Sequence, residues 1–222
     1  MRAIWALALW LATLGPALAQ PIVYVANRQS SFVSVVDSFT LRTIATIEVG
    51  GTPVGLAMSP DGASAWVTVD TTQAGGSRVV RVIDTGSRGV FPAIAGLPLS
   101  AGLTGITFRP DGARAYVADA AANRVYVIDP VALRVVTSIQ VAAGPIGLTP
   151  VSNQQGLVAS AGGRTLSLID LGANTVIATN PTGPNPGAIA LNPTGSRAYL
   201  LFTATANSFN DTLSVEIGRA HV

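Results

Sequence analysis

One short phrase recurs four times along this chain and constrains its fold more than any other feature. In each copy aliphatic residues fill the first, third and fourth positions and an aspartate follows, as at the end of a short β-strand. A self-similar unit of roughly 40–50 residues built from such strands is typical of the blades of a β-propeller. The copies are Val33–Asp37, Val80–Asp84, Val125–Asp129 and Leu166–Asp170, with their aspartates 47, 45 and 41 residues apart.

The third copy displays one complete unit. Alternating apolar segments at 105–109, 114–118, 123–128 and 135–141 predict four strands joined by short connections. Four antiparallel strands make one propeller blade. We therefore predict an all-β fold, a β-propeller of four-stranded antiparallel blades over residues 20–216, with about four to five blades present as an open arc or incomplete ring.

Two kinds of turn residue repeat together with the strands. Pro-Asp-Gly between the first and second strands suits a type I turn, because proline presets φ and glycine favours the last position. The aspartate that ends each third strand is expected to accept hydrogen bonds from backbone amides two residues on. A row of metal-binding carboxylates is the alternative, but these aspartates belong to different blades, too far apart to share an ion. We assign structural turn roles to Asp37, Asp84, Asp129, Asp170, Asp61, Gly62, Asp111 and Gly112.

Four motifs follow one another in a fixed order in the repeats. They are Tyr24-Val-Ala-Asn27, the Val-x-Val-Ile-Asp phrase, the Pro53-Val-Gly55 start of the innermost strand and the Ser59-Pro-Asp-Gly62 turn. Together, from Ile22 to Val215, they resemble the YVTN-type β-propeller repeat of surface-layer and other exported bacterial and archaeal proteins. The resemblance implies a seven-bladed extracytoplasmic propeller without implying a single activity. The chain departs from the pattern at Thr104, before Gly156 and in its fifth copy.

The first nineteen residues have the layout of a secretory signal peptide. Arg2 precedes an apolar run, and Ala17-Leu18-Ala19 forms a small-residue cleavage site. A membrane anchor is the alternative, but the apolar run is well short of the ~20 residues that cross a bilayer. We expect residues 1–19 to be removed and the protein to be periplasmic or extracellular, with no membrane insertion after cleavage.

The C-terminal residues break the repeat. Leu213-Ser-Val215 begins like a fifth copy of the phrase, but the aspartate is missing and 217–222 reads Ile-Gly-Arg-Ala-His-Val. Back-translated, this hexapeptide matches a common sequencing adapter, so we expect 217–222 to be a non-native tail on a longer gene. A genuine degenerate final strand is the alternative. An incomplete ring would leave strand edges near Tyr24 and Leu213 unpaired.

Charge and residue types argue against several classes of function. Of 13 basic residues, Arg2 and Arg219 lie in the signal segment and the tail, which leaves 11 against 11 acidic residues. Nucleic-acid binding needs clustered basic residues, so the neutral body gives no support for it. The chain has no cysteine, and its one histidine, His221, lies in the expected tail. We therefore assign no catalytic residue, no metal site and no cofactor. An all-carboxylate calcium site near Asp70, Asp119 or Asp211 lacks the spacing of a known loop.

Function is best sought on the loops whose length varies between repeats. Loops between the second and third strands and between blades share one end of the sheets, and binding residues are often carried by such loops on a rigid scaffold. We predict an exported, non-enzymatic binding or scaffold protein that engages a protein, glycan or small ligand. The alternative is the N-terminal part of an exported lyase-, lactonase- or quinoprotein-like enzyme with catalytic residues in missing blades. The candidate binding residues are Asp70, Arg78, Asn123, Arg124, Asn207, Asn210 and Asp211.

Overall fold

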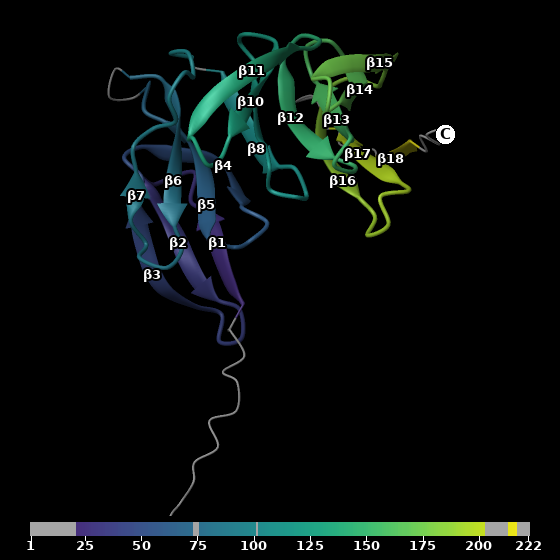
Figure 1. The fold of residues 1–222 in the computed structure, drawn as a ribbon. Coiled ribbons are helices and arrows are strands. Elements are labelled where there is room, and N and C mark those ends of the chain that lie inside the picture. Colours follow the sequence, from purple (N-terminus) through teal and green to yellow (C-terminus); the bar gives the residue numbers. More distant parts are fainter. Residues whose placement is uncertain (1–20, 73–75, 101, 203–212, 217–222) are drawn as a thin grey trace, which may run out of the picture.

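The computed structural model describes residues 21–72, 76–100 and 102–202, together with the backbone of 213–216. Within these ranges the chain forms five antiparallel sheets, and each sheet takes consecutive strands in chain order (Figure 1). The described residues include no helix long and apolar enough to cross a membrane. The strands are β1 (Ile22–Ala26), β2 (Phe32–Asp37), β3 (Arg42–Glu48); β4 (Thr52–Met58), β5 (Ser64–Asp70), β6 (Arg78–Asp84), β7 (Val90–Phe91); β8 (Leu103–Phe108), β9 (Ala115–Asp119), β10 (Arg124–Asp129), β11 (Arg134–Gln140); β12 (Pro145–Pro150), β13 (Gln155–Ser160), β14 (Thr165–Asp170), β15 (Thr175–Pro181); and β16 (Pro186–Leu191), β17 (Ala198–Phe202), β18 (Leu213–Glu216).

The predicted all-β fold of four-stranded antiparallel sheets is confirmed. Three sheets have four strands, paired in the order innermost to outermost, and the first and last sheets have three. The strands of the third sheet lie within two residues of the segments expected from the sequence. The repeated phrase forms the third strand of each four-stranded sheet, and its residues alternate between the two faces.

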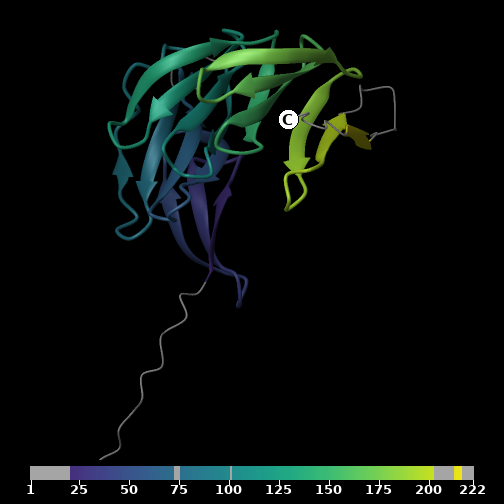
Figure 2. The same ribbon diagram turned by 45° about the vertical axis from the view of Figure 1, so that its right-hand side comes forward.

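The sheets stand side by side in an arc. β4 contacts β8 and β8 contacts β12, so the innermost strands of neighbouring sheets line the concave side. Figure 2 shows the first sheet, in purple, and the last sheet, in yellow-green, at the two ends of this arc. The arrangement matches the expected packing of propeller blades around an axis.

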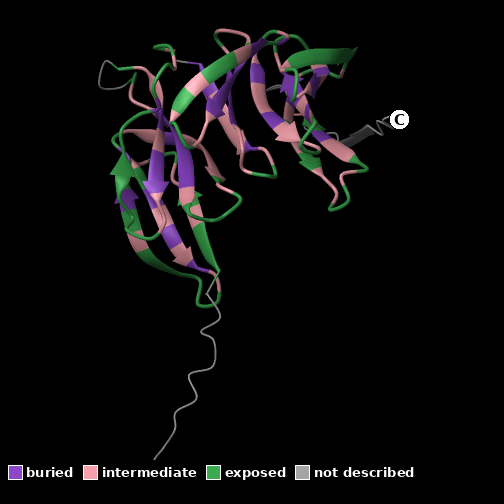
Figure 3. Ribbon diagram, in the orientation of Figure 1, coloured by how far each residue is buried: buried purple, intermediate pink, exposed green. Residues whose placement is uncertain are grey.

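The core consists of apolar layers between successive sheets. Val33 and Val35 of the first sheet are fully buried against Val67 and Ile83 of the second. Trp66 packs against Phe108 of the third sheet, with ring centroids 5.1 Å apart in an edge-to-face geometry. Outermost strands such as β3 and β15 are largely exposed (Figure 3). Each sheet therefore buries both faces only where it has a neighbour on each side.

Glycines let the innermost strands approach each other closely. A Cβ placed on Gly105 would lie 2.7 Å from the carbonyl oxygen of Ile146 and 3.0 Å from the Cα of Gly147. A Cβ on Gly55 would lie 3.0 Å from the carbonyl oxygen of Thr104. The 2.7 Å contact is shorter than a real Cβ makes and the 3.0 Å contacts are tighter than most, so the spacing between the sheets depends on glycine, above all at Gly105.

Threonine hydroxyls also make hydrogen bonds between neighbouring sheets, from β5 to β8 and from β8 to β12. The Thr68 hydroxyl donates to the Thr104 carbonyl oxygen at 2.9 Å, and the Thr104 hydroxyl donates to the Pro145 carbonyl oxygen at 3.2 Å. The departure at Thr104 noted in the sequence is wrong in its position, because Leu103 stands where the second and fourth repeats have Pro53 and Pro145, and Thr104 stands where they have Val54 and Ile146. An aliphatic residue at that position has no hydroxyl with which to bridge the third and fourth sheets.

We predict that Gly105→Ala destabilises the protein by about 1–3 kcal/mol, because the added methyl must push the third and fourth sheets apart. Gly147→Ala is the matched control. A Cβ on Gly147 would meet only the Cα of Gly105, at an ordinary 3.7 Å, so its effect should stay within about 0.5 kcal/mol. Urea unfolding of both variants measures the difference. Equal destabilisation by the two substitutions would contradict this account of the sheet spacing.

Candidate functional site

The two ends of the sheets differ in their connections. We call the end with the tight turns the turn face; it holds the first-to-second-strand turns at 59–63, 109–114, 151–154 and 192–197 and the third-to-fourth-strand turns at 38–41, 85–89, 130–133 and 171–174. The opposite end is the loop face. Among the described residues it holds the second-to-third-strand loops at 27–31, 71–72, 76–77, 120–123 and 161–164 and the links between sheets at 49–51, 92–100, 102, 141–144 and 182–185.

On the turn face, the aspartate after each third strand anchors the next turn. The Asp37 carboxylate accepts hydrogen bonds from the amides of Phe39 and Thr40, at 2.9 and 2.8 Å. These bonds, that of Thr40 foremost, lower the pKa of Asp37. Asp84, Asp129 and Asp170 also accept turn amides, and the residue four positions after each aspartate is left-handed: Leu41, Arg88, Leu133 and Asn174.

The Pro-Asp-Gly turns are held by their own aspartates. Asp61 accepts from the Ser59 hydroxyl at 2.6 Å and from the Ala63 amide at 3.0 Å. Asp111 pairs with the Arg109 guanidinium at 2.7 Å, and that hydrogen bond is the main reason why its pKa is lowered. Gly62 and Gly112 have φ of 71° and 72°, a conformation that favours glycine.

On the loop face, Asp70 and Arg78 come together. The Arg78 Nε lies 2.8 Å from the Asp70 carboxylate, and both side chains are mostly shielded from solvent. Hydrogen bonds from the Thr72 hydroxyl and amide, followed by the Arg78 guanidinium, lower the pKa of Asp70 from 3.8 to about 2. Arg78 also donates from Nη1 to the Leu103 carbonyl oxygen at 2.9 Å, so the pair ties the second sheet to the third.

A buried carboxylate lies beside this pair. Asp119 ends β9, as Asp70 ends β5, and is fully buried. Its Oδ1 accepts the Ser100 hydroxyl at 2.9 Å and the amides of Ala121 and Ala122 at 3.0 Å. The Ser100 carbonyl oxygen in turn accepts the Arg78 amide at 2.8 Å. Sequence reasoning missed Ser100, because no local signal connects the long 92–102 link to the end of β9.

The other described candidate residues, Asn123 and Arg124, belong to the third sheet and make hydrogen bonds of their own. Asn123 has φ of 54° and its side-chain oxygen accepts the Gly144 amide at 2.9 Å, which joins the third sheet to the following link. Arg124 is exposed and donates to the Ser138 hydroxyl at 2.9 Å. The candidates Asn207, Asn210 and Asp211 fall outside the described residues. The described residues contain no group of three or more His, Cys, Asp or Glu side chains placed to hold a metal.

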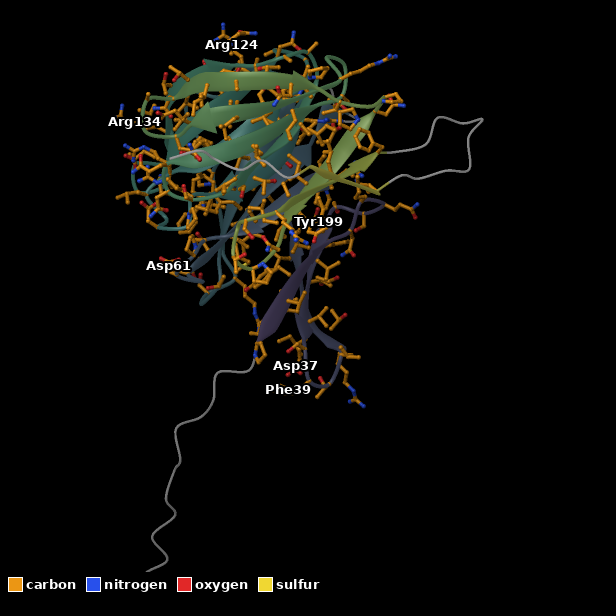
Figure 4. All side chains as sticks on the ribbon, turned by 90° about the vertical axis from the view of Figure 1, so that its right-hand side faces the viewer. Asp37, Phe39, Asp61, Arg124, Arg134 and Tyr199 are labelled. Carbon is orange, nitrogen blue, oxygen red and sulfur yellow. The ribbon has the colours of Figure 1, made fainter. Side chains whose placement is uncertain are left out.

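Exposed arginines lie on both faces but in different surroundings. On the loop face, three different sheets each have an exposed arginine at the connection between their second and third strands: Arg28, Arg124 and Arg164. Glu48, the last residue of β3, is an exposed acidic residue of the same face. On the turn face arginines lie beside the turn aspartates, since Arg42 is opposite Asp37 and Arg134 is opposite Asp129. Figure 4 shows Arg124 on the side of the molecule away from Asp37 and Phe39.

Comparison with solved structures shows the same fold elsewhere. The chain is similar to a chain of Kuenenia stuttgartiensis hydrazine synthase, a propeller-containing protein, with a TM-score of 0.76 and 21% identity over 90% of this chain. It is also similar to a protein of unknown function from Desulfotomaculum acetoxidans, with a TM-score of 0.68 and 14% identity over 86% of this chain. The chain covers 60% and 64% of those two chains. No family model and no curated protein matches it.

We predict that Asp70→Asn removes a pH-dependent part of the stability. Because the folded-state pKa of Asp70 lies below its ordinary 3.8, the carboxylate stabilises the fold above that value and the benefit disappears as the pH falls towards about 2. Given its partial exposure, this benefit is roughly 1 kcal/mol at neutral pH. Urea unfolding of wild type and variant at neutral pH and at about pH 2 measures it.

Glu48→Gln, which removes an exposed carboxylate of the same face, serves as the control and should change the unfolding free energy little. A difference between wild type and Asp70→Asn that is the same at every pH would show that the side chain acts through packing and not through its charge.

Proposed function

We propose that this protein is an exported, non-enzymatic propeller that binds an anionic partner through its loop face. One observation carries the proposal: three sheets each present an exposed arginine at that face. Guanidinium groups offer paired N–H donors that match carboxylate and sulfate oxygens. Arginines spread over separate blades suit an extended acidic partner, and we favour an acidic glycan over an acidic protein or a small ligand, because a polymer with regularly spaced charges reaches several blades at once.

The network beneath these arginines supports the proposal. Arg78, Ser100 and Asp119 join the second and third sheets, and Asn123 joins the third sheet to the link that follows. These bonds fix the backbone from which the exposed side chains project. A fixed backbone lowers the entropic cost of binding, since fewer groups have to be ordered when the partner arrives. Asp70, Arg78 and Asn123 then act as supports of the binding face, and Arg124 is the candidate that faces the partner.

We predict that Arg28→Gln, Arg124→Gln and Arg164→Gln, combined in one variant, weaken binding to dextran sulfate. Loss of three positive charges should lower the salt concentration of elution from a dextran sulfate column and reduce the affinity at least tenfold at low salt. Glutamine keeps a donor for Ser138, so the local structure around residue 124 is retained.

The matched control carries Arg42→Gln, Arg88→Gln and Arg134→Gln, which remove the same net charge from the turn face. Its elution should remain close to that of the wild type, and neutral dextran should retain none of the three proteins. Equal loss of binding in both variants would show that overall charge and not the loop face governs the interaction. Absence of binding by the wild type would argue against an anionic glycan.

Two further parts of the proposal rest on the sequence. Export rests on the signal-like residues 1–19, and membership of the YVTN-type family rests on the ordered motifs from Tyr24 to Gly62. A second candidate function, the N-terminal part of an exported enzyme, draws support from the likeness to hydrazine synthase, of whose chain this one covers 60%. Sequencing the gene beyond codon 216 discriminates between them: further repeats that place His and Glu on innermost strands would favour an enzyme, and repeats of the present composition would oppose it.

A further inference from the structure

The second residue of the repeated phrase varies between the copies, and in the second sheet it is Arg81. Arg81 lies opposite Val67 of β5 and two positions before Ile83 of β6, so the three side chains share one face of the sheet. Val67 and Ile83 belong to the layer that packs on the first sheet, and every buried member of that layer is aliphatic. Arg81 therefore places a charge beside an apolar layer.

Arg81 is unlike the other half-buried arginines because it has no partner. Among the described residues it makes no hydrogen bond and no ion pair. Its Nε is sealed from solvent without an acceptor, whereas its two Nη groups, also without acceptors, reach solvent. A shielded N–H that is left unbonded lowers stability, so the fold gains nothing from this donor. The other half-buried arginines each pair with an aspartate: Arg78 with Asp70, Arg109 with Asp111 and Arg114 with Asp129.

The fourth strand stops short of this position in the second sheet. In the first, third and fourth sheets a fourth-strand hydroxyl residue pairs with the corresponding residue: Thr46 with Ser34, Ser138 with Tyr126 and Thr179 with Ser167. β7 has only two residues, which pair with Val82 and Ile83, so no fourth-strand residue pairs with Arg81. β3 and β7 are the outermost strands of the first two sheets (Figure 1). The guanidinium is therefore accessible from the outer edge of these sheets.

We propose that Arg81 binds the carboxylate of a small amphipathic acid at the outer edge of the first and second sheets. Its free Nη groups offer the paired donors that a carboxylate accepts from a guanidinium. One unpaired positive charge balances a monocarboxylate better than it balances a phosphate dianion. The acid supplies the acceptor that the other half-buried arginines find in an aspartate of this chain.

Apolar side chains beside Arg81 suit the body of such an acid. Val79 lies two positions before Arg81 on the same face of β6 and is half-buried against the apolar layer, as is Ala45 of β3. Val90 of β7 pairs with Ile83 and is 39% exposed. A short alkyl chain can cover this partly exposed surface while its carboxylate meets the guanidinium, and removal of apolar surface from water favours binding. An inorganic anion would leave the same surface exposed.

This site is independent of the anionic partner proposed for the loop face. Arg81 lies in the middle of β6, between Arg78 at the loop end and Asp84 at the turn end, and belongs to neither face. Replacing Arg81 should therefore change the elution from dextran sulfate little. The two proposals can fail separately, because each has its own ligand and its own variant.

The test uses octanoate, a straight-chain monocarboxylate, added to the full chain. Octanoate should bind saturably, raise the melting temperature and shift the Nε–Hε resonance of Arg81 in an NMR titration. Octanol has the same alkyl body without the charge, and inorganic phosphate has the charge without the body. Each should bind at least tenfold more weakly than octanoate. Equal binding of octanol or of phosphate would overturn the assignment of an amphipathic acid.

The matched variants are Arg81→Met and Arg42→Met. Methionine keeps an apolar stem at residue 81 and removes the unbonded donor, so the ligand-free variant should melt at or above the wild-type temperature, and octanoate should no longer raise it. Arg42→Met removes an exposed arginine of the neighbouring sheet and should keep the full response to octanoate.

Three results would overturn the proposal. An Arg81 resonance that octanoate leaves unmoved would show that the guanidinium does not meet the acid. An equal octanoate response of wild type and Arg81→Met would place the binding elsewhere. A ligand-free Arg81→Met that melts well below the wild type would show that the arginine has a structural role.

Discussion

The close approach of neighbouring innermost strands is the constraint on which the rest of the structure depends. Gly55 and Gly105 allow the backbone of one sheet to contact that of the next, and the hydroxyls of Thr68 and Thr104 donate hydrogen bonds to the next sheet. These contacts set the separation of the sheets at the concave side. The apolar layers further out, such as Trp66 against Phe108, can pack at ordinary density only at that separation.

The last pair of sheets illustrates this dependence. At the position where the second, third and fourth sheets have glycine, β16 has Ala188. A Cβ on Gly147 would meet no atom of β16 within 4 Å, whereas the glycines of the second and third sheets face backbone atoms at 3.0 Å or less. One methyl group on the inner strand thus accompanies a wider gap between the fourth and fifth sheets.

Much of the fold could be predicted from the sequence, but the contacts between sheets could not. The aspartate-terminated phrase and the Pro-Asp-Gly turns are local signals, so strands and turns followed from short segments such as Val125–Asp129. The bond from Ser100 to Asp119 and the bond from Arg78 to the Leu103 carbonyl join residues 19 and 25 positions apart in the sequence that belong to different structural elements. The repeat pattern of the sequence carries no signal for hydrogen bonds between residues so far apart. For that reason sequence reasoning found Asp70 and Arg78 as candidates without revealing that their polar groups are engaged by neighbouring loops.

The aspartate-anchored turns have a consequence for how such repeats diverge. One side chain, as at Asp37 or Asp129, shapes each turn, and the left-handed position four residues later is filled by leucine, arginine, leucine and asparagine in the four copies. The backbone geometry of the turn is therefore maintained by a single carboxylate, while the residues around it differ between copies. Repeats of this kind can lose nearly all pairwise identity and keep their shape. Distant copies in other chains are better sought by the spacing of that aspartate than by the apolar residues of the strand.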